Sequence, residues 1–115
     1  MVLGNVTELR NLPQLILTSP VAVTADTVIA EITGSIANSN VTVVTIQCTM
    51  EDAGRYYLVD DGGYKHYLTN PNEDYPAKLQ MLATYFLEKD QVVNLKFSGT
   101  TTMTGLIVTM GAGIY

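Results

Sequence analysis

The residues with the greatest potential for chemistry gather between positions 55 and 67, where RYYLVDDGGYKHY places four tyrosines around an acidic turn. Tyrosine rings stack on the apolar faces of sugars, and Asp, Lys and His side chains hydrogen-bond to hydroxyl groups. A subunit interface and ordinary sheet packing are the alternatives, because tyrosine is a favourable strand residue and the adjacent Tyr56 and Tyr57 must face opposite sides. For a shallow saccharide site, the candidate residues are Tyr56, Asp61, Tyr64, Lys65 and His66.

Catalytic signatures are missing from the sequence. Cys48 and His66 are the single cysteine and the single histidine, and no flanking motif marks Cys48 as a nucleophile. Cys48 alternates with Val44 and Ile46 on one face of an expected strand, so we expect it in the core as a small hydrophobe. No phosphate-binding glycine loop, zinc-protease motif or nucleophile elbow occurs. We therefore expect no catalytic residues and no cofactor.

Asp60 and Asp61 form a carboxylate pair that could serve acid-base chemistry or bind Ca²⁺. Calcium requires several oxygen ligands converging from one loop, and the short segment 60–63 offers too few of them. Asp-Asp-Gly-Gly is above all a turn sequence, because these residues tolerate positive φ angles. We therefore expect a turn here and no metal site.

Composition limits the class of protein. The chain has 115 residues, of which 47% are hydrophobic and 15% charged, so it can bury one core and forms one domain. Its net charge of −5 opposes binding to nucleic acid, since phosphate backbones would be repelled. No run approaches the roughly 20 apolar residues of a membrane span, so no membrane insertion is expected. The many threonines and few charges favour burial of surface between subunits.

The beginning of the chain carries little targeting information. Residues 1–4 do not form a charged region followed by an apolar run, so secretion would require that the start Met has replaced a signal peptide. The lone Cys48 excludes an intrachain disulfide and leaves the compartment open. A virion is the alternative localisation. Residues 1–20, interrupted by Pro13 and closed by Pro20, suit an N-terminal arm or an edge strand.

Alternating apolar residues predict mostly β structure for the remainder. Strands are expected at 26–36 and Val41–Met50, joined as a hairpin, and at 55–59 and 64–69, joined around the turn at 60–63. The strand pattern ends at residues 70–76, and a helical pattern follows. Asp74 can cap a helix, Pro76 fits its first turn, and an apolar stripe at helical spacing predicts a helix over 75–88. That stripe consists of Leu79, Leu82, Ala83 and Phe86.

Two more strands are expected, at Val92–Phe97 and through Leu106 to Met110. A helix between the third and fourth strands is the element order of an OB-fold. The fold class predicted from sequence is therefore mainly β, a small OB-fold-like barrel over 21–115 with one helix at about 75–88.

Residues 77–110 carry a resemblance to a known family. The stretch LQMLATYFLEKDQVVNLKFSGTTTMTGLIVTM resembles the helix and the last two strands of the B subunits of bacterial AB toxins, such as cholera and heat-labile enterotoxin. Those subunits form ring-shaped pentamers that bind cell-surface glycans and carry an enzymatic A subunit. They also contain a disulfide and a sugar-stacking tryptophan, which this chain lacks, so a glycan site here would use different residues.

The resemblance implies a non-catalytic, glycan-binding subunit of a ring-shaped homo-oligomer, with a cell-surface glycan and a second, enzymatic subunit as further partners. The alternative is a structural protein. A Thr-rich, acidic, mostly β chain without a disulfide also suits a virion component, such as a phage capsid or tail protein, whose task is to assemble with copies of itself.

Overall fold

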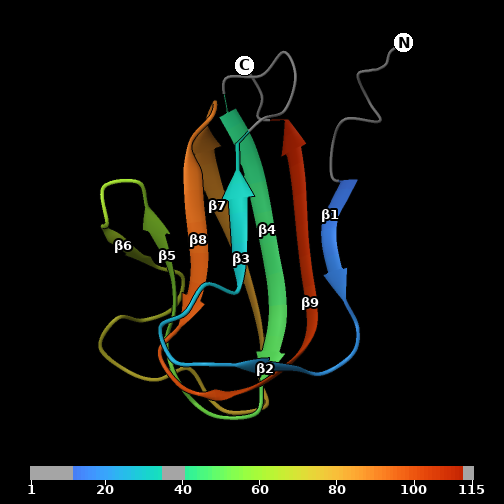
Figure 1. The fold of residues 1–115 in the computed structure, drawn as a ribbon, viewed down its shortest axis with the longest axis vertical. Coiled ribbons are helices and arrows are strands. Elements are labelled where there is room, and N and C mark those ends of the chain that lie inside the picture. Colours follow the sequence, from blue (N-terminus) through green and yellow to red (C-terminus); the bar gives the residue numbers. More distant parts are fainter. Residues whose placement is uncertain (1–11, 35–40, 113–115) are drawn as a thin grey trace.

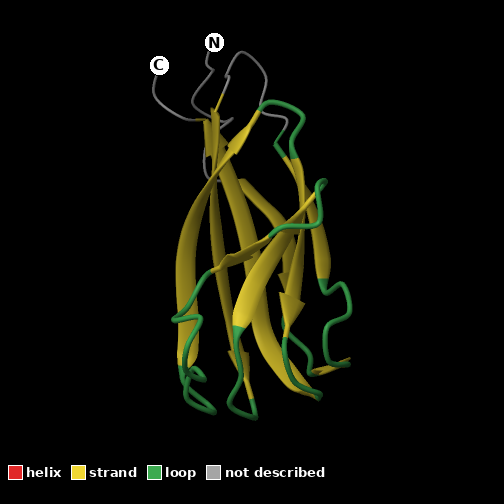
Figure 2. Cartoon of the chain, turned by 90° about the vertical axis from the view of Figure 1, so that its left-hand side faces the viewer, coloured by secondary structure: helices red, strands yellow, loops and turns green. Residues whose placement is uncertain are grey.

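The computed structural model describes residues 12–34 and 41–112. In this part of the chain the structure is a sandwich of two antiparallel sheets joined by loops, and it contains no helix (Figures 1 and 2). The strands are β1 (Leu12–Leu17), β2 (Val21–Val23), β3 (Ala30–Thr33), β4 (Val41–Met50), β5 (Tyr56–Asp60), β6 (Lys65–Tyr67), β7 (Gln80–Glu88), β8 (Val92–Phe97) and β9 (Thr101–Ala112).

The two sheets have a distinctive strand order. Sheet A has the order β1-β9-β4-β7, with β2 also paired to β9, and sheet B has the order β3-β8-β5-β6. β1 and β2 follow one another along β9 and are separated by Pro20, which has no N–H to donate to the ladder. Counted as one interrupted strand, they complete eight strands in the order of a jelly roll, a double-sheet fold built from two Greek keys.

The core lies between the sheets and follows from simple alternation. In β4 every second residue is buried, and β8 in the other sheet alternates in the same way. Cys48 is 1% exposed, so the expectation that it packs in the core is confirmed. The largest fully buried side chains are those of Tyr56, Phe97, Ile46, Met50, Leu58, Met81, Leu87, Leu95, Met103 and Leu106.

The helix expected over 75–88 is wrong, because residues 80–88 form strand β7. Nine consecutive residue pairs join β7 to β4, from Thr49↔Gln80 to Val41↔Glu88. The odd-numbered residues of β7 face the core, whereas Leu82 and Phe86 face outward and are 66% and 64% exposed. Apolar residues on both faces of a strand imitate a helical stripe, and pairing with β4 decides between the two structures.

The expected helix cap also has another role. Asp74 lies in the loop before β7 and forms an ion pair with Arg55, with an Nε–Oδ1 distance of 3.3 Å. With the helix absent and no described pairing that closes the two sheets into one cylinder, the OB-fold element order is not observed. The coarser prediction of a mainly β chain is confirmed.

Strand prediction succeeded where alternation was strict. β4 and β8 have the predicted bounds, and β5 and β6 form the predicted hairpin. The hairpin expected between 26–36 and 41–50 is wrong, because β3 pairs with β8 in sheet B whereas β4 pairs with β7 and β9 in sheet A. β3 and β4 are consecutive in the chain but belong to different sheets, so closeness in sequence does not imply pairing here.

Gly54 offers a test of this packing. A Cβ atom at this position would lie 2.3 Å from Cζ of the buried Phe97 ring, which Tyr56 holds edge-on at a centroid distance of 4.8 Å. We expect Gly54→Ala to lower the free energy of unfolding by about 1–3 kcal/mol in urea denaturation, because the ring has no room to move. Gly99→Ala is the control, since its Cβ would meet the same ring at an ordinary 3.5 Å. Equal stability of the two variants would contradict the packing described here.

Candidate functional site

The β5–β6 hairpin contains most of the residues singled out from the sequence. Asp60 organises its turn: one carboxylate oxygen accepts hydrogen bonds from the backbone N–H groups of Gly62 (2.9 Å) and Tyr64 (3.0 Å). Gly63 has a φ angle of +83°, a conformation that glycine adopts without a steric penalty. The turn expected at 60–63 is therefore confirmed, and Asp60 has a structural role in it.

The second carboxylate oxygen of Asp60 lies 2.8 Å from Nε2 of His66. His66 stands opposite Leu58 in the β5–β6 register and points toward the space between the sheets, where its ring lies 5.8 Å from that of Tyr85 in β7. The hydrogen bond from His66, followed by that from the backbone N–H of Tyr64, lowers the pKa of the Asp60 carboxyl. Burial and the nearby Asp60 charge raise the pKa of the Tyr85 hydroxyl. His66 thus links the hairpin to the facing sheet.

The five candidate residues do not converge on one surface. Tyr56 is 1% exposed and packs in the core, away from any ligand. Tyr64 is 72% exposed beside the exposed Asp61 and Lys65, whereas His66 turns inward to Asp60. Three of the five candidate residues for a saccharide site are therefore exposed on the hairpin, namely Asp61, Tyr64 and Lys65.

The environment of Cys48 disfavours the ionised form of its thiol. Burial raises the pKa of its thiol to about 12, only partly offset by a hydrogen bond with Tyr56. The thiolate, which is the reactive form, is therefore scarce at neutral pH. Among residues 12–34 and 41–112, no group of three or more His, Cys, Asp or Glu side chains is placed to hold a metal ion. No helix in that part is long and apolar enough to cross a membrane.

Sequence reasoning missed the role of Tyr57. This residue points to the outer side of sheet B, yet it is only 2% exposed, because its hydroxyl donates a hydrogen bond to Asp26 at 2.5 Å and the Lys65 amine lies 4.8 Å above its ring. Burial, and then the bond to Asp26, raises the pKa of the Tyr57 hydroxyl. The contact fastens the β2–β3 loop over sheet B. Asp26 lies 31 residues upstream, so no local signal could have revealed it.

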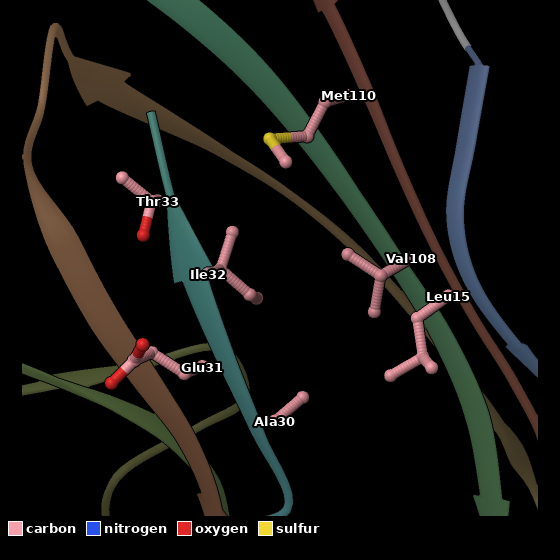
Figure 3. Close-up of a pocket in the computed structure, with 7 residues that line it drawn as sticks. All are labelled: Leu15, Ala30, Glu31, Ile32, Thr33, Val108 and Met110. Atoms are coloured by element: carbon pink, nitrogen blue, oxygen red, sulfur yellow. The ribbon is translucent and has the colours of Figure 1, made fainter. Parts of the chain in front are cut away.

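A cleft of about 400 Å³ opens at the opposite edge of the sandwich, between β1 and β3 (Figure 3). Its lining residues are Leu15, Ala30, Glu31, Ile32, Thr33, Val108 and Met110. In Figure 3 the Glu31 carboxylate points away from Leu15 and Val108, so the floor of the cleft is apolar. Binding sites for small molecules combine apolar walls with a few convergent polar groups. Glu31 and Thr33 are the two polar side chains that line this cleft, so it has few groups that could orient a ligand.

The outer face of sheet A differs from the rest of the surface. We use this name for the outward-facing residues of β1, β9, β4 and β7, which among those with described side chains are Ile16, Thr102, Thr104, Ile107, Thr109, Val41, Val43, Thr45, Gln47, Thr49, Gln80, Leu82, Thr84, Phe86 and Glu88. Glu88, at one end of β7, is the single ionisable residue among them. By contrast, the outer side of sheet B carries Glu31, Lys65 and Lys96. The charge of the described chain is thus segregated away from sheet A.

Three large apolar side chains protrude from this face, which has Glu88 as its single ionisable residue among those with described side chains. Leu82 is 66% exposed, Phe86 is 64% exposed and Ile16 is 51% exposed. Leu82 pairs with Gln47, and Gln47 pairs with Ile107, which in turn pairs with Ile16, so these residues form one row across the four strands. Depletion of charge around protruding apolar groups is typical of the central part of a protein interface.

Comparisons of the chain with models of protein families, with curated proteins and with solved structures found no match. Interpretation of the site therefore depends on the geometry described above.

The Asp60 carboxylate provides a test of the hairpin by pH. Because its pKa is lowered in the folded chain, its interactions stabilise the fold above about pH 4, and this stabilisation is lost as the pH falls through the lowered value. We expect Asp60→Asn to be less stable than the wild type at pH 7 in urea denaturation, with the difference shrinking as the pH falls below about 4. Asp61→Asn, which removes the same charge one residue away, should lower stability less. A difference for Asp60→Asn that does not change with pH would contradict this role.

Proposed function

We propose that this chain is a non-catalytic, self-assembling structural subunit, such as a component of a virion, and that copies associate through the outer face of sheet A. One observation carries the proposal: this face has Glu88 as its single ionisable residue among those with described side chains, while Leu82 and Phe86 protrude from it. In a chain with a net charge of −5, charged residues on the other surfaces maintain solubility. Burial of a face with so few charges then has a small desolvation cost.

The size of the face fits a second copy. Four strands spaced about 4.8 Å apart, with ten residues rising about 3.3 Å each along β4, cover roughly 600 Å². Two such faces would bury about 1,200 Å² together, which exceeds the roughly 1,000 Å² that a specific interface needs. Two sheets also pack well face to face at about 10 Å, so the same face of another copy is a suitable partner.

The strand order is compatible with this role. Jelly rolls occur in viral capsid subunits and also in lectins and cupins, so the fold leaves several functions open. The neutral outer face favours the structural role, because neither sugar binding nor catalysis requires an uncharged sheet surface. The partner proposed here is therefore a second copy of this chain.

A single charge at the centre of the face should weaken assembly. Thr45 faces outward in β4 and pairs with Thr84 on one side and Thr109 on the other. We expect Thr45→Lys to weaken self-association at least 30-fold, about 2 kcal/mol, in sedimentation equilibrium, because burying an unpaired ammonium is costly. Asn94→Lys adds the same charge to the outer side of sheet B and should leave the mass unchanged. A wild-type chain that stays monomeric at high concentration would refute the proposal.

Glycan binding at the β5–β6 hairpin is a second candidate function. It is favoured by the exposure of Tyr64, which at 72% is the greatest among the exposed large hydrophobic residues of the described chain, with Asp61 and Lys65 beside it. An exposed ring with flanking hydrogen-bonding groups is the minimal arrangement for holding a sugar. The partner in this case would be a cell-surface glycan, as in the toxin B subunits that the sequence resembles.

A glycan array measures this second function directly. If the hairpin binds sugar, Tyr64→Ala should abolish binding, since it removes the stacking ring without touching the core. Leu82→Ala is the matched control, because it removes a similarly exposed apolar side chain from sheet A. An array on which the wild type binds no glycan, or on which both variants lose binding equally, would refute a hairpin site.

A further inference from the structure

β7 ends sheet A, and the middle of its outer edge has no strand partner among the described residues. No described strand pairs with its far side, and its nine residues include neither proline nor lysine. Its ladder with β4 runs through nine pairs without a register shift, so no bulge twists the edge away. Proteins usually blunt an edge with such features, because free N–H and C=O groups are a template for another strand. A long edge that lacks them is suited to pairing.

Hydrogen bonds at both ends of β7 show which backbone groups face away from β4. The carbonyl of Gln80 accepts a hydrogen bond from the hydroxyl of Tyr75 in the preceding loop (2.6 Å). The N–H of Glu88 donates a hydrogen bond to the side-chain oxygen of Gln91 in the following turn (3.0 Å). In an antiparallel strand, alternate residues direct both backbone groups to the same neighbour. The set facing the free edge therefore includes Leu82, Thr84 and Phe86.

We propose that β7 pairs antiparallel with β7 of a second copy about a two-fold axis at Thr84. This inference rests on the proposed self-assembly and adds its geometry. The axis places Leu82 opposite Phe86 of the partner subunit, and the symmetry repeats the pair on the other side of the axis. Gln80 then lies opposite the partner's Glu88, so no like charges oppose each other.

Other positions of the axis give poorer pairs. An axis at Phe86 would place Leu82 opposite the partner's Asp90, and an axis at Leu82 would place Phe86 opposite the partner's Lys78. Axes at the odd-numbered positions 83 and 85 set the same apolar residues against threonine, glutamine or glutamate. The axis at Thr84 is thus the one that pairs the two most exposed large hydrophobic residues of sheet A with each other on both sides.

Pairing about Thr84 would also enlarge the surface on which the proposed function depends. The two copies of sheet A would become one continuous sheet, and their neutral outer faces would lie side by side. Each dimer would then present about twice the uncharged area of one copy to the next layer of the assembly.

Two double variants test the register. Leu82→Lys/Phe86→Glu sets an ammonium opposite a carboxylate at both outer pairs, whereas Leu82→Lys/Phe86→Lys sets two ammonium groups opposite each other. Both variants add two charged side chains to the outer face, so both should weaken face-to-face packing. In sedimentation equilibrium at low salt, we expect the first to remain dimeric and the second to dissociate at least tenfold more readily. Identical behaviour of the two folded variants would overturn the proposed register.

Cysteine cross-linking tests the axis in an otherwise unchanged chain. Across the axis, the Cα atoms of the two Thr84 residues would lie about 5.5 Å apart, within the range of a disulfide. Mild oxidation of Thr84→Cys should therefore yield a covalent dimer on a non-reducing gel. The equally accessible Leu82→Cys should not, because its two copies would be about 13 Å apart along the strands.

These outcomes separate the two proposals. An oligomeric wild type whose Thr84→Cys variant does not cross-link would overturn the edge dimer and leave assembly through the outer face standing. A cross-linked Thr84→Cys variant together with insensitivity to Thr45→Lys would support the edge dimer and overturn face-to-face packing. A wild type that is monomeric at all concentrations would overturn both.

Discussion

The pairing of β4 on both of its sides is the constraint on which the rest of the structure depends. β4 forms nine residue pairs with β7 and eight with β9, and its inward residues reach almost complete burial. Its register decides which side of β7 faces the core: Met81 stands opposite Cys48 and points inward. Leu82 and Phe86 are turned outward by the same ladder. The exposure of Leu82 and Phe86 on the outer face is thus a consequence of the register in which β4 buries its inward residues.

Elements with a strict two-residue period could be predicted from the sequence, and elements that depend on distant partners could not. Val41–Met50 and Val92–Phe97 alternate cleanly and have the bounds that the pattern indicates. The placement of β3 beside β8 joins residues more than 55 positions apart, and it follows from sheet packing instead of turn chemistry. Local turn residues favour a hairpin at residues 26–50, whereas burial of the core is achieved by pairing β3 with β8.

The candidate site shows the same division. The acidic turn at 60–63 and the exposure of Tyr64 follow from local sequence, since Gly and Asp tolerate the turn and the tip of a hairpin meets solvent. The sequence also requires Tyr56 and Tyr57 to face opposite sides, but it does not say which side is the core. Tyr57 is covered because Asp26 of a distant loop reaches its hydroxyl and Lys65 lies over its ring. Contacts of this kind decide which tyrosines are available to a ligand.

The misprediction of β7 and the interaction proposed for it have one physical origin. A strand with apolar residues on its inner face alone shows a clear two-residue period. β7 carries apolar residues on both faces and therefore imitates the stripe of a helix. In an isolated sheet those outward side chains would cost solubility without stabilising the fold. A free edge and a neutral face in the same strand suit a chain whose structure is completed by another copy. Burial of Leu82 and Phe86 between copies would then satisfy the same apolar groups that made the sequence ambiguous.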